Sequence, residues 1–203
     1  MAKGADNPFS YEGKRVVITG AYSGVGAALL ELIDSLGAEH ITVVDLKEPS
    51  GPATEFVQAD LSDQAAVDRA VAAIDGWDES LAWIAARPEL FADPYALSKE
   101  CMQVYTMWSA RDAQRRGLRV NSVCPSPIET PLLPDFRQTM SDKTIDWCIE
   151  ESGRVAQPRD IALVLAFLGT DASGFVNGVN LNVDLGFSAG MAMGQVDFGA
   201  LMA

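Results

Sequence analysis

A turn with three closely spaced glycines, TGAYSGVG at residues 19–26, constrains the fold of this chain more than any other feature. The β-branched run at 15–20 predicts a buried strand before it, and the apolar spacing at 24–36 predicts a helix that stops at Gly37. Such a turn between a strand and a helix is typical of nucleotide-diphosphate binding. The helix N-terminus can hold the anion through unpaired N–H groups, so the net charge of −13 is no obstacle.

Each residue of the turn has a predicted task. Gly20 permits the sharp turn, Gly24 lets the backbone approach a diphosphate, and Gly26 lets the helix pack close to the sheet. Ser23 and Val25 complete the predicted cofactor contacts of this turn.

The rest of the pattern alternates strands and helices, which predicts a parallel sheet with right-handed crossovers. The expected fold class is therefore α/β, a Rossmann-type doubly wound parallel sheet, as a single dinucleotide-binding and catalytic domain over residues 1–203. The apolar tail at 187–203 is either a loosely ordered terminus or a segment that packs on another subunit or over the substrate pocket. Further strands are expected at 41–46, 56–59, 119–125 and 179–184, and helices at 62–74, 94–116, 135–150 and from Pro158.

An acid at the end of the second predicted strand indicates the cofactor. Asp45 lies where the adenosine ribose of a dinucleotide is expected, and its carboxylate can accept both ribose hydroxyls. The same carboxylate would repel the 2′-phosphate of NADP, and Lys47 is the only cation nearby. We therefore predict NAD rather than NADP. The alternative is that Asp45 is an ordinary surface acid at a strand end.

The predicted helix at 94–116 carries a second motif. Tyr95 and Lys99 are four residues apart, so they share one face. Free tyrosine, with a pKa of about 10, is a poor base at neutral pH, and a nearby ammonium group favours the phenolate. We predict Tyr95 as the acid/base and Lys99 as its activator and a clamp on the nicotinamide ribose. A Tyr/Lys pair at this spacing is more often a chance feature of an exposed helix face. It indicates a catalytic site only in combination with the glycine turn.

Together the two motifs resemble the TGxxxGxG and YxxxK of the short-chain dehydrogenase/reductase family, and in particular its 3α-hydroxysteroid and coniferyl alcohol dehydrogenase-like subgroup. The resemblance implies that Asp60 and Leu61 contact the adenine. It also implies cofactor contacts from Pro125, Ile128 and Thr130, in the loop after the strand at 119–125. Two departures stand out: Ser126 and Leu185 replace glycines that are common in the family.

The resemblance covers residues 12–75 and 94–187, but the middle of the family pattern is absent. The fourth and fifth strands of the family sheet order 3-2-1-4-5-6-7, and the catalytic Asn and Ser, have no clear counterpart. Ser80 is the one weak candidate for that serine. The flanking strands would stand about 14 Å apart. Either the sequence omits a segment near 76–77 or the deletion is real and the sheet has rearranged; the intact flanking halves favour omission.

The predicted function is an NAD-dependent oxidoreductase, a short-chain alcohol dehydrogenase/carbonyl reductase. It would interconvert a secondary or aromatic alcohol and its carbonyl compound by hydride transfer. The apolar loop at 128–133 indicates a hydrophobic substrate. One alternative is an inactive NAD-binding module that lacks the helper Ser and Asn. Another is a protein for a different adenine ligand, such as a methyl donor, which would leave Tyr95 and Lys99 idle.

Composition and charge disfavour other classes. An acidic chain is a poor partner for nucleic acid or an anionic membrane. One histidine and three scattered cysteines predict no metal site. The start of the chain has no signal-peptide pattern, so a cytoplasmic location is expected. The family resemblance implies a homodimer or homotetramer through the helix of Tyr95.

Overall fold

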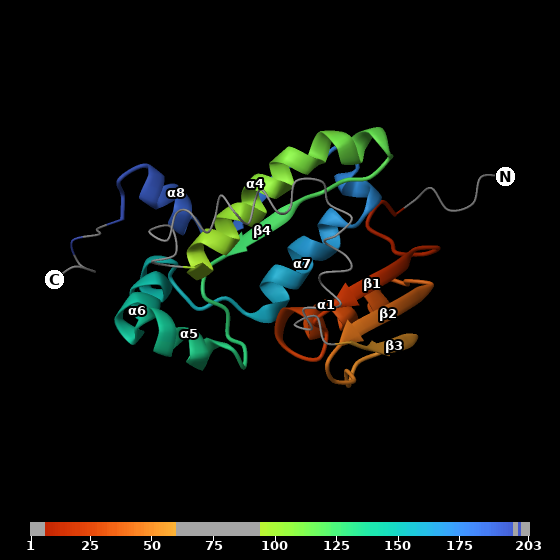
Figure 1. Cartoon of the computed structure of the whole chain (residues 1–203), viewed down its shortest axis with the longest axis horizontal. Helices are drawn as coiled ribbons and strands as arrows, with labels where there is room; N and C mark the ends of the chain where they lie inside the picture. Colours follow the sequence, from red (N-terminus) through yellow and green to blue (C-terminus); the bar gives the residue numbers. More distant parts are fainter. Residues whose placement is uncertain (1–6, 60–93, 197–198, 200–203) are drawn as a thin grey trace, which may run out of the picture.

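The computed structural model describes residues 7–59, 94–196 and 199, arranged as parallel strands with helices packed against them (Figure 1). The elements are β1 (Arg15–Thr19), α1 (Gly24–Ser35), β2 (His40–Asp45), β3 (Glu55–Gln58), α4 (Pro94–Arg115), β4 (Ser122–Pro125), α5 (Leu133–Met140), α6 (Asp142–Glu151), α7 (Pro158–Leu168), the 3₁₀ turn η2 (Asp171–Ser173), β5 (Asn180–Val183) and α8 (Phe187–Ala192).

The first half of the chain forms a three-stranded parallel sheet in the order β1-β2-β3. The register pairs Val17 with Thr42, and Thr42 with Glu55. β-branched residues dominate β1 and β2, as expected for strands buried in a parallel sheet. The predicted strand–turn–helix unit is confirmed, because α1 begins at Gly24 and Gly37 follows its last turn with a φ of +86°.

The second half forms a separate two-stranded parallel sheet of β4 and β5, in which Val123 pairs with Leu181. α4 runs alongside it (Figure 1), and the side-chain amide of Asn180 donates to the carbonyl of Gln103 on that helix at 3.2 Å. These two strands correspond to the sixth and seventh strands of the predicted order, and β1 to β3 correspond to the first three.

No ladder joins β1 to β4 within the described ranges. The face of β1 that points away from α1 is solvent-exposed at Val17, which is 68% exposed. A doubly wound sheet has helices on both faces, but no described helix covers this face of β1 at Val17. The position at 76–77, where we expect the sequence to be interrupted, is outside the described residues, as is the predicted helix at 62–74.

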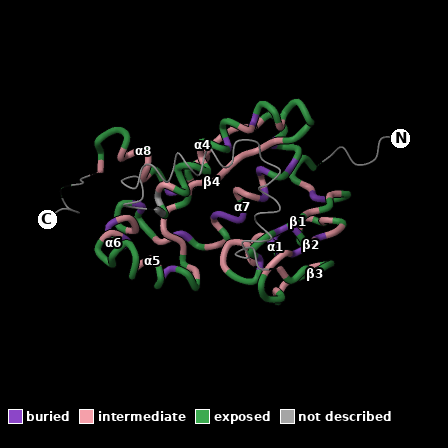
Figure 2. The backbone as a smooth tube through the Cα atoms, viewed as in Figure 1, coloured by how far each residue is buried: buried purple, intermediate pink, exposed green. Residues whose placement is uncertain are grey.

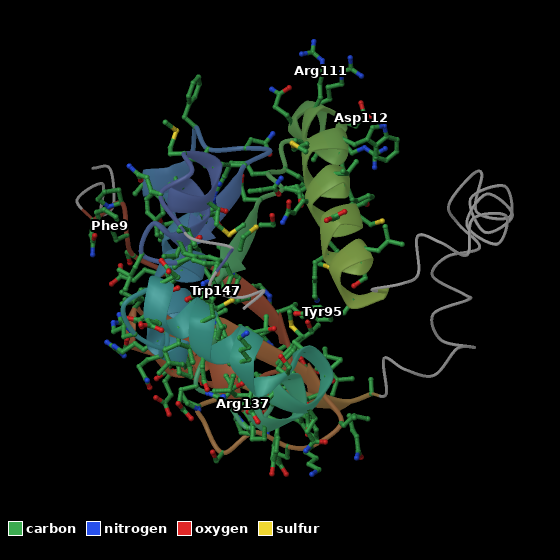
Figure 3. The ribbon with its side chains drawn as sticks, turned by 90° about the vertical axis from the view of Figure 1, so that its left-hand side faces the viewer. Phe9, Tyr95, Arg111, Asp112, Arg137 and Trp147 are labelled. Atoms are coloured by element: carbon green, nitrogen blue, oxygen red, sulfur yellow. The ribbon has the colours of Figure 1, made fainter. Side chains whose placement is uncertain are left out.

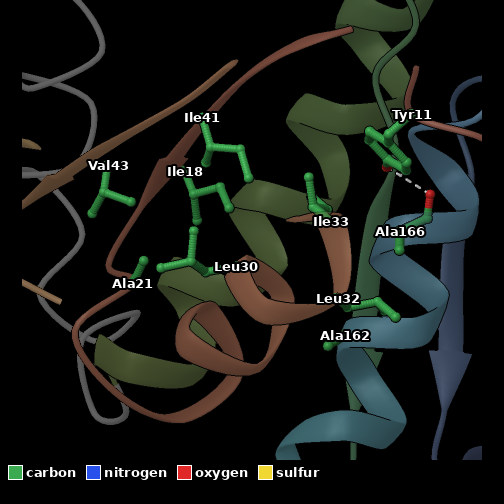
Figure 4. Close-up of a cluster of buried hydrophobic side chains, with 10 residues drawn as sticks. All are labelled: Tyr11, Ile18, Ala21, Leu30, Leu32, Ile33, Ile41, Val43, Ala162 and Ala166. Carbon is green, nitrogen blue, oxygen red and sulfur yellow. Dashed lines mark hydrogen bonds between the residues drawn. The ribbon is translucent and has the colours of Figure 1, made fainter. Parts of the chain in front are cut away.

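The two halves meet where α7 packs against α1 (Figure 4). Buried residues concentrate at this junction (Figure 2), and Leu30, Ile33 and Ala162 belong to its core cluster. The phenol of buried Tyr11 donates to the carbonyl of Ala166 at 2.8 Å, which ties the N-terminal segment to α7. This core fixes the glycine turn relative to the second half of the chain.

Two sequence-based predictions were wrong in their boundaries. The single helix expected at 135–150 is two helices, because Ser141 adopts a φ of +76° and caps α6 by accepting from the N–H of Thr144. The strand expected at 119–125 begins only at Ser122. Before it, side chains replace the strand ladder: the N–H of Val120 donates to the side-chain oxygen of Asn177 at 2.8 Å.

The beginning of the apolar tail is ordered by packing. It forms α8, and Phe187 makes an edge contact with Trp147 of α6 at 5.4 Å between ring centroids. This part of the tail therefore packs against the chain's own α6, and its contact with another subunit or with the substrate pocket stays a prediction. None of the helices in the described segments has the length and apolar character that crossing a bilayer requires.

Candidate active site

The glycine turn has a geometry that side chains would obstruct. Gly20 has a φ of +72°, which favours glycine, and a Cβ built on Gly26 would overlap the carbonyl oxygen of Gly20. Ser23 is the N-cap residue of α1, with extended backbone and no side-chain capping bond. The first turn of α1 therefore presents backbone N–H groups next to glycines that have no side chains. This arrangement fits the diphosphate of a dinucleotide.

Asp45 ends β2 directly beside this turn. Its carboxylate accepts hydrogen bonds from the backbone N–H of Tyr22 at 2.9 Å and of Lys47 at 3.3 Å. Partial burial raises the pKa of Asp45, but these hydrogen bonds and the charge of Lys47 outweigh it and leave the pKa below its usual value. The group is thus a fixed anion at neutral pH, placed at the adenosine end of the predicted cofactor site.

The loop after β4 reaches across to the glycine turn. A Cβ on Gly24 would lie 3.3 Å from the Cγ2 atom of Thr130, so these two predicted cofactor residues are neighbours. The loop is held by a parallel bridge between Ile128 and Ala156, in which the N–H of Glu129 donates to the carbonyl of Ala156 at 2.8 Å. The structure therefore brings together predicted residues that are about a hundred positions apart in the sequence.

Tyr95 lies at the N-terminal end of α4, on the side that faces α5 and α6 (Figure 3). The ammonium of Lys99 lies 5.2 Å from the centroid of the Tyr95 ring, one turn further along the helix. The ring of Phe136, from α5, meets Tyr95 edge-on at 5.2 Å between centroids and an interplanar angle of 70°. Tyr95 as a whole residue is 42% exposed, so it lies at the surface of the molecule.

Phe136 is a neighbour of Tyr95 that was not predicted from the sequence. The only signal was an aromatic residue shortly after the apolar loop at 128–133. α5 is held to α6 by Arg137, whose guanidinium bonds Asp142 at 3.1 Å and Asp146 at 2.7 Å. The predicted contacts of Asp60 and Leu61, and the candidate Ser80, fall outside the described residues.

A family model matches residues 85–188, just over half of the chain; its description is enoyl-(acyl carrier protein) reductase. The coniferyl-alcohol dehydrogenase of a Pseudomonas species is 23% identical over 248 residues, covering 87% of this chain and 97% of that protein. That alignment is longer than this 203-residue chain, so part of the relative has no counterpart here. The meso-2,3-butanediol dehydrogenase of Serratia marcescens is 37% identical over 95 residues, which is 47% of this chain but only 37% of that relative.

Solved structures of the same fold align with most of the chain. A structure assigned as a 2-deoxy-D-gluconate 3-dehydrogenase from Agrobacterium tumefaciens, with bound NADP, matches at a TM-score of 0.68 and 23% identity. It covers 91% of this chain and all of that one. A hydroxysteroid dehydrogenase from Escherichia coli matches at a TM-score of 0.66 and 20% identity, over 89% and 99% of the two chains. With these matches and its Rossmann-type architecture, the chain belongs to the short-chain dehydrogenase/reductase family, a family of oxidoreductases.

Proposed function

We propose that this protein is an NAD-dependent dehydrogenase/reductase that interconverts a hydrophobic secondary or aromatic alcohol and its carbonyl compound. The observation that carries the proposal is the cluster of Tyr95, Lys99 and Phe136 on the side of α4 that faces α5. In this cluster the phenol of Tyr95 would transfer the proton, Lys99 supplies a cation, and Phe136 supplies an apolar surface. The names of two relatives, a coniferyl-alcohol dehydrogenase and a butanediol dehydrogenase, support an alcohol substrate.

The preference for NAD rests on Asp45. An ionised carboxylate held by two backbone N–H groups can accept the hydroxyls of an adenosine ribose, and it repels a phosphate at the same place. The NADP bound in the Agrobacterium structure belongs to that protein. The discriminating measurement is the ratio of the dissociation constants for NAD and NADP.

The mechanism assigns one task to each residue. The nicotinamide, when bound, supplies or accepts the hydride. Tyr95 takes the proton from the substrate hydroxyl during oxidation and returns it during reduction. Lys99 favours the charged form of the phenol and would hold the nicotinamide ribose. Phe136 excludes water from one side of Tyr95 and offers an aromatic edge to a hydrophobic substrate.

An inactive NAD-binding protein is a second candidate, favoured by one observation. The two sheets are not joined within the described ranges, and Val17 of β1 is open. If the elements that carry the family's helper serine and asparagine are missing from the protein, the cofactor would bind without turnover.

The experiment that separates these functions measures absorbance at 340 nm with NAD and a panel of aromatic and secondary alcohols, and NAD affinity by calorimetry. For the dehydrogenase we expect turnover that falls at least about 100-fold in Tyr95→Phe, because general acid–base catalysis is lost, with NAD affinity nearly unchanged. NAD binding without turnover would select the inactive protein. Turnover that survives the substitution would contradict the role of Tyr95.

A further inference from the structure

Beside Asp45, a lysine and a tyrosine form a pair that the proposed mechanism does not use. The ammonium of Lys47 lies over the ring of Tyr22, at 5.1 Å from its centroid. Tyr22 is part of the glycine turn, and Lys47 follows β2 by two residues. Both residues also donate their backbone N–H groups to the carboxylate of Asp45. Three side chains from two segments thus converge at the adenosine end of the cofactor site.

The position of the ammonium bears on cofactor choice. A lysine close to the ribose-binding acid is the kind of cation that can hold the 2′-phosphate of NADP, since it adds a point charge on a flexible stem. Here the ring face of Tyr22 competes for that charge, because the negative face of an aromatic ring attracts an ammonium group. The ring and the ammonium are both exposed, so the pair is weak enough for substitutions to shift it.

We propose that Tyr22 is a cofactor-selectivity residue, whose ring holds the Lys47 ammonium against the glycine turn and away from a 2′-phosphate. The inference rests on the proposed binding of a nicotinamide dinucleotide. It adds a second barrier to NADP beyond the repulsion from Asp45. Lys47, the described cation that follows Asp45 in the sequence, is already engaged by the ring of Tyr22.

The test measures dissociation constants for NAD and NADP by calorimetry on wild type, Tyr22→Leu, Lys47→Gln and the double variant. An exposed cation–π pair predicts that Tyr22→Leu strengthens NADP binding about two- to fivefold while NAD affinity stays within twofold. In the Lys47→Gln background the same substitution should bring no gain, because the cation is gone. The matched control Tyr22→Phe keeps the ring face and should bind both cofactors as wild type does.

The possible results separate the proposals. The selectivity role is overturned if Tyr22→Leu weakens both cofactors equally, which would mean that the ring contacts the adenosine. A gain that persists without Lys47, or no gain at all, would also overturn it. If folded wild-type protein binds neither dinucleotide, the proposed function itself fails and the selectivity role with it; thermal melting of each variant verifies the fold.

Discussion

A methyl group on Gly26 would have no space, because its Cβ would overlap the backbone carbonyl of Gly20. We therefore expect Gly26→Ala to lower the free energy of unfolding by about 1–3 kcal/mol, as overpacking does, and to abolish NAD binding. Denaturant unfolding and calorimetry check the two effects. Ser23→Ala is the matched control, since that side chain makes no capping bond; it should leave stability within about 0.5 kcal/mol of wild type.

These residues show how far local sequence predicts a site. Gly20, Gly26 and Asp45 were predictable because a strand–turn–helix unit fixes their places within one stretch of chain. The family resemblance implied only that Thr130 contacts the cofactor, and its approach to Gly24 was not predicted. The contact of Phe136 with Tyr95 was not predicted, because it depends on where α5 docks, some forty residues further along the chain.

The turn between β5 and α8 contains a leucine in a conformation that favours glycine. Leu185 has a φ of +53° and is 69% exposed, so packing of its side chain stabilises the fold little. Removing the Cβ relieves left-handed strain of about 1–2 kcal/mol, against a smaller entropic cost in the unfolded chain. We expect Leu185→Gly to raise the free energy of unfolding by about 1 kcal/mol in urea titration. Leu185→Ala keeps the Cβ, so a comparable gain there would contradict this explanation.

Asp184 holds the same turn through its carboxylate, which accepts from the N–H groups of Gly186 and Ser188, each at 3.0 Å. Burial raises the pKa of Asp184, but a hydrogen bond from the Ser188 side chain and the backbone hydrogen bonds outweigh it and lower the pKa below its usual value. The carboxylate therefore stabilises the fold above the unfolded pKa of about 4, and this stability is lost as the pH falls through the lower folded pKa. Asp184→Asn should cost about 1 kcal/mol at pH 7, a deficit that narrows below about pH 4 in unfolding titrations. A deficit independent of pH would point to lost packing instead.

Helix boundaries show a second limit of sequence reasoning. Residues 135–150 contain no glycine or proline that would mark the break at Ser141, and we predicted one helix there. The break depends on a left-handed backbone at Ser141, and on Arg137 reaching Asp142 and Asp146 across the corner. A serine before an acidic first turn is an N-cap signal, and Ser141 followed by Asp142 would have predicted the start of α6.

The arrangement of the whole chain follows from two halves that share one core. The family resemblance predicted the strand order at both ends of the sheet, β1-β2-β3 and β4-β5. The hydrogen bond from Tyr11 to Ala166 of α7, which connects the two halves, was not predicted, because these residues are 155 positions apart in the sequence. Within the described ranges, no ladder joins β1 to β4, where the family pattern lacks its middle.

The helix that carries Tyr95 is buried on one side and exposes apolar residues on the opposite side. Thr106 and Ala110 are buried against the rest of the chain, whereas the other side presents an exposed apolar stripe. The stripe consists of half-buried Leu97 and exposed Cys101, Val104, Tyr105 and Trp108, and Glu100 lines the same surface. Because a contiguous exposed apolar stripe is typical of an interface, and the resemblance implies a subunit contact through this helix, we propose that two copies pair here.

Trp108, which is 75% exposed, is the residue to change, because a tryptophan at an interface commonly contributes 2 kcal/mol or more. We expect the wild-type chain to sediment as a dimer or larger oligomer. Trp108→Arg should weaken the dimer by about 30-fold or more, since it places a charge in a desolvated contact. Gln114→Arg adds the same charge at an exposed position on another side of α4 and should leave assembly unchanged. Equal dissociation constants for the two variants in sedimentation velocity would place the subunit contact elsewhere and leave the stripe without its proposed partner.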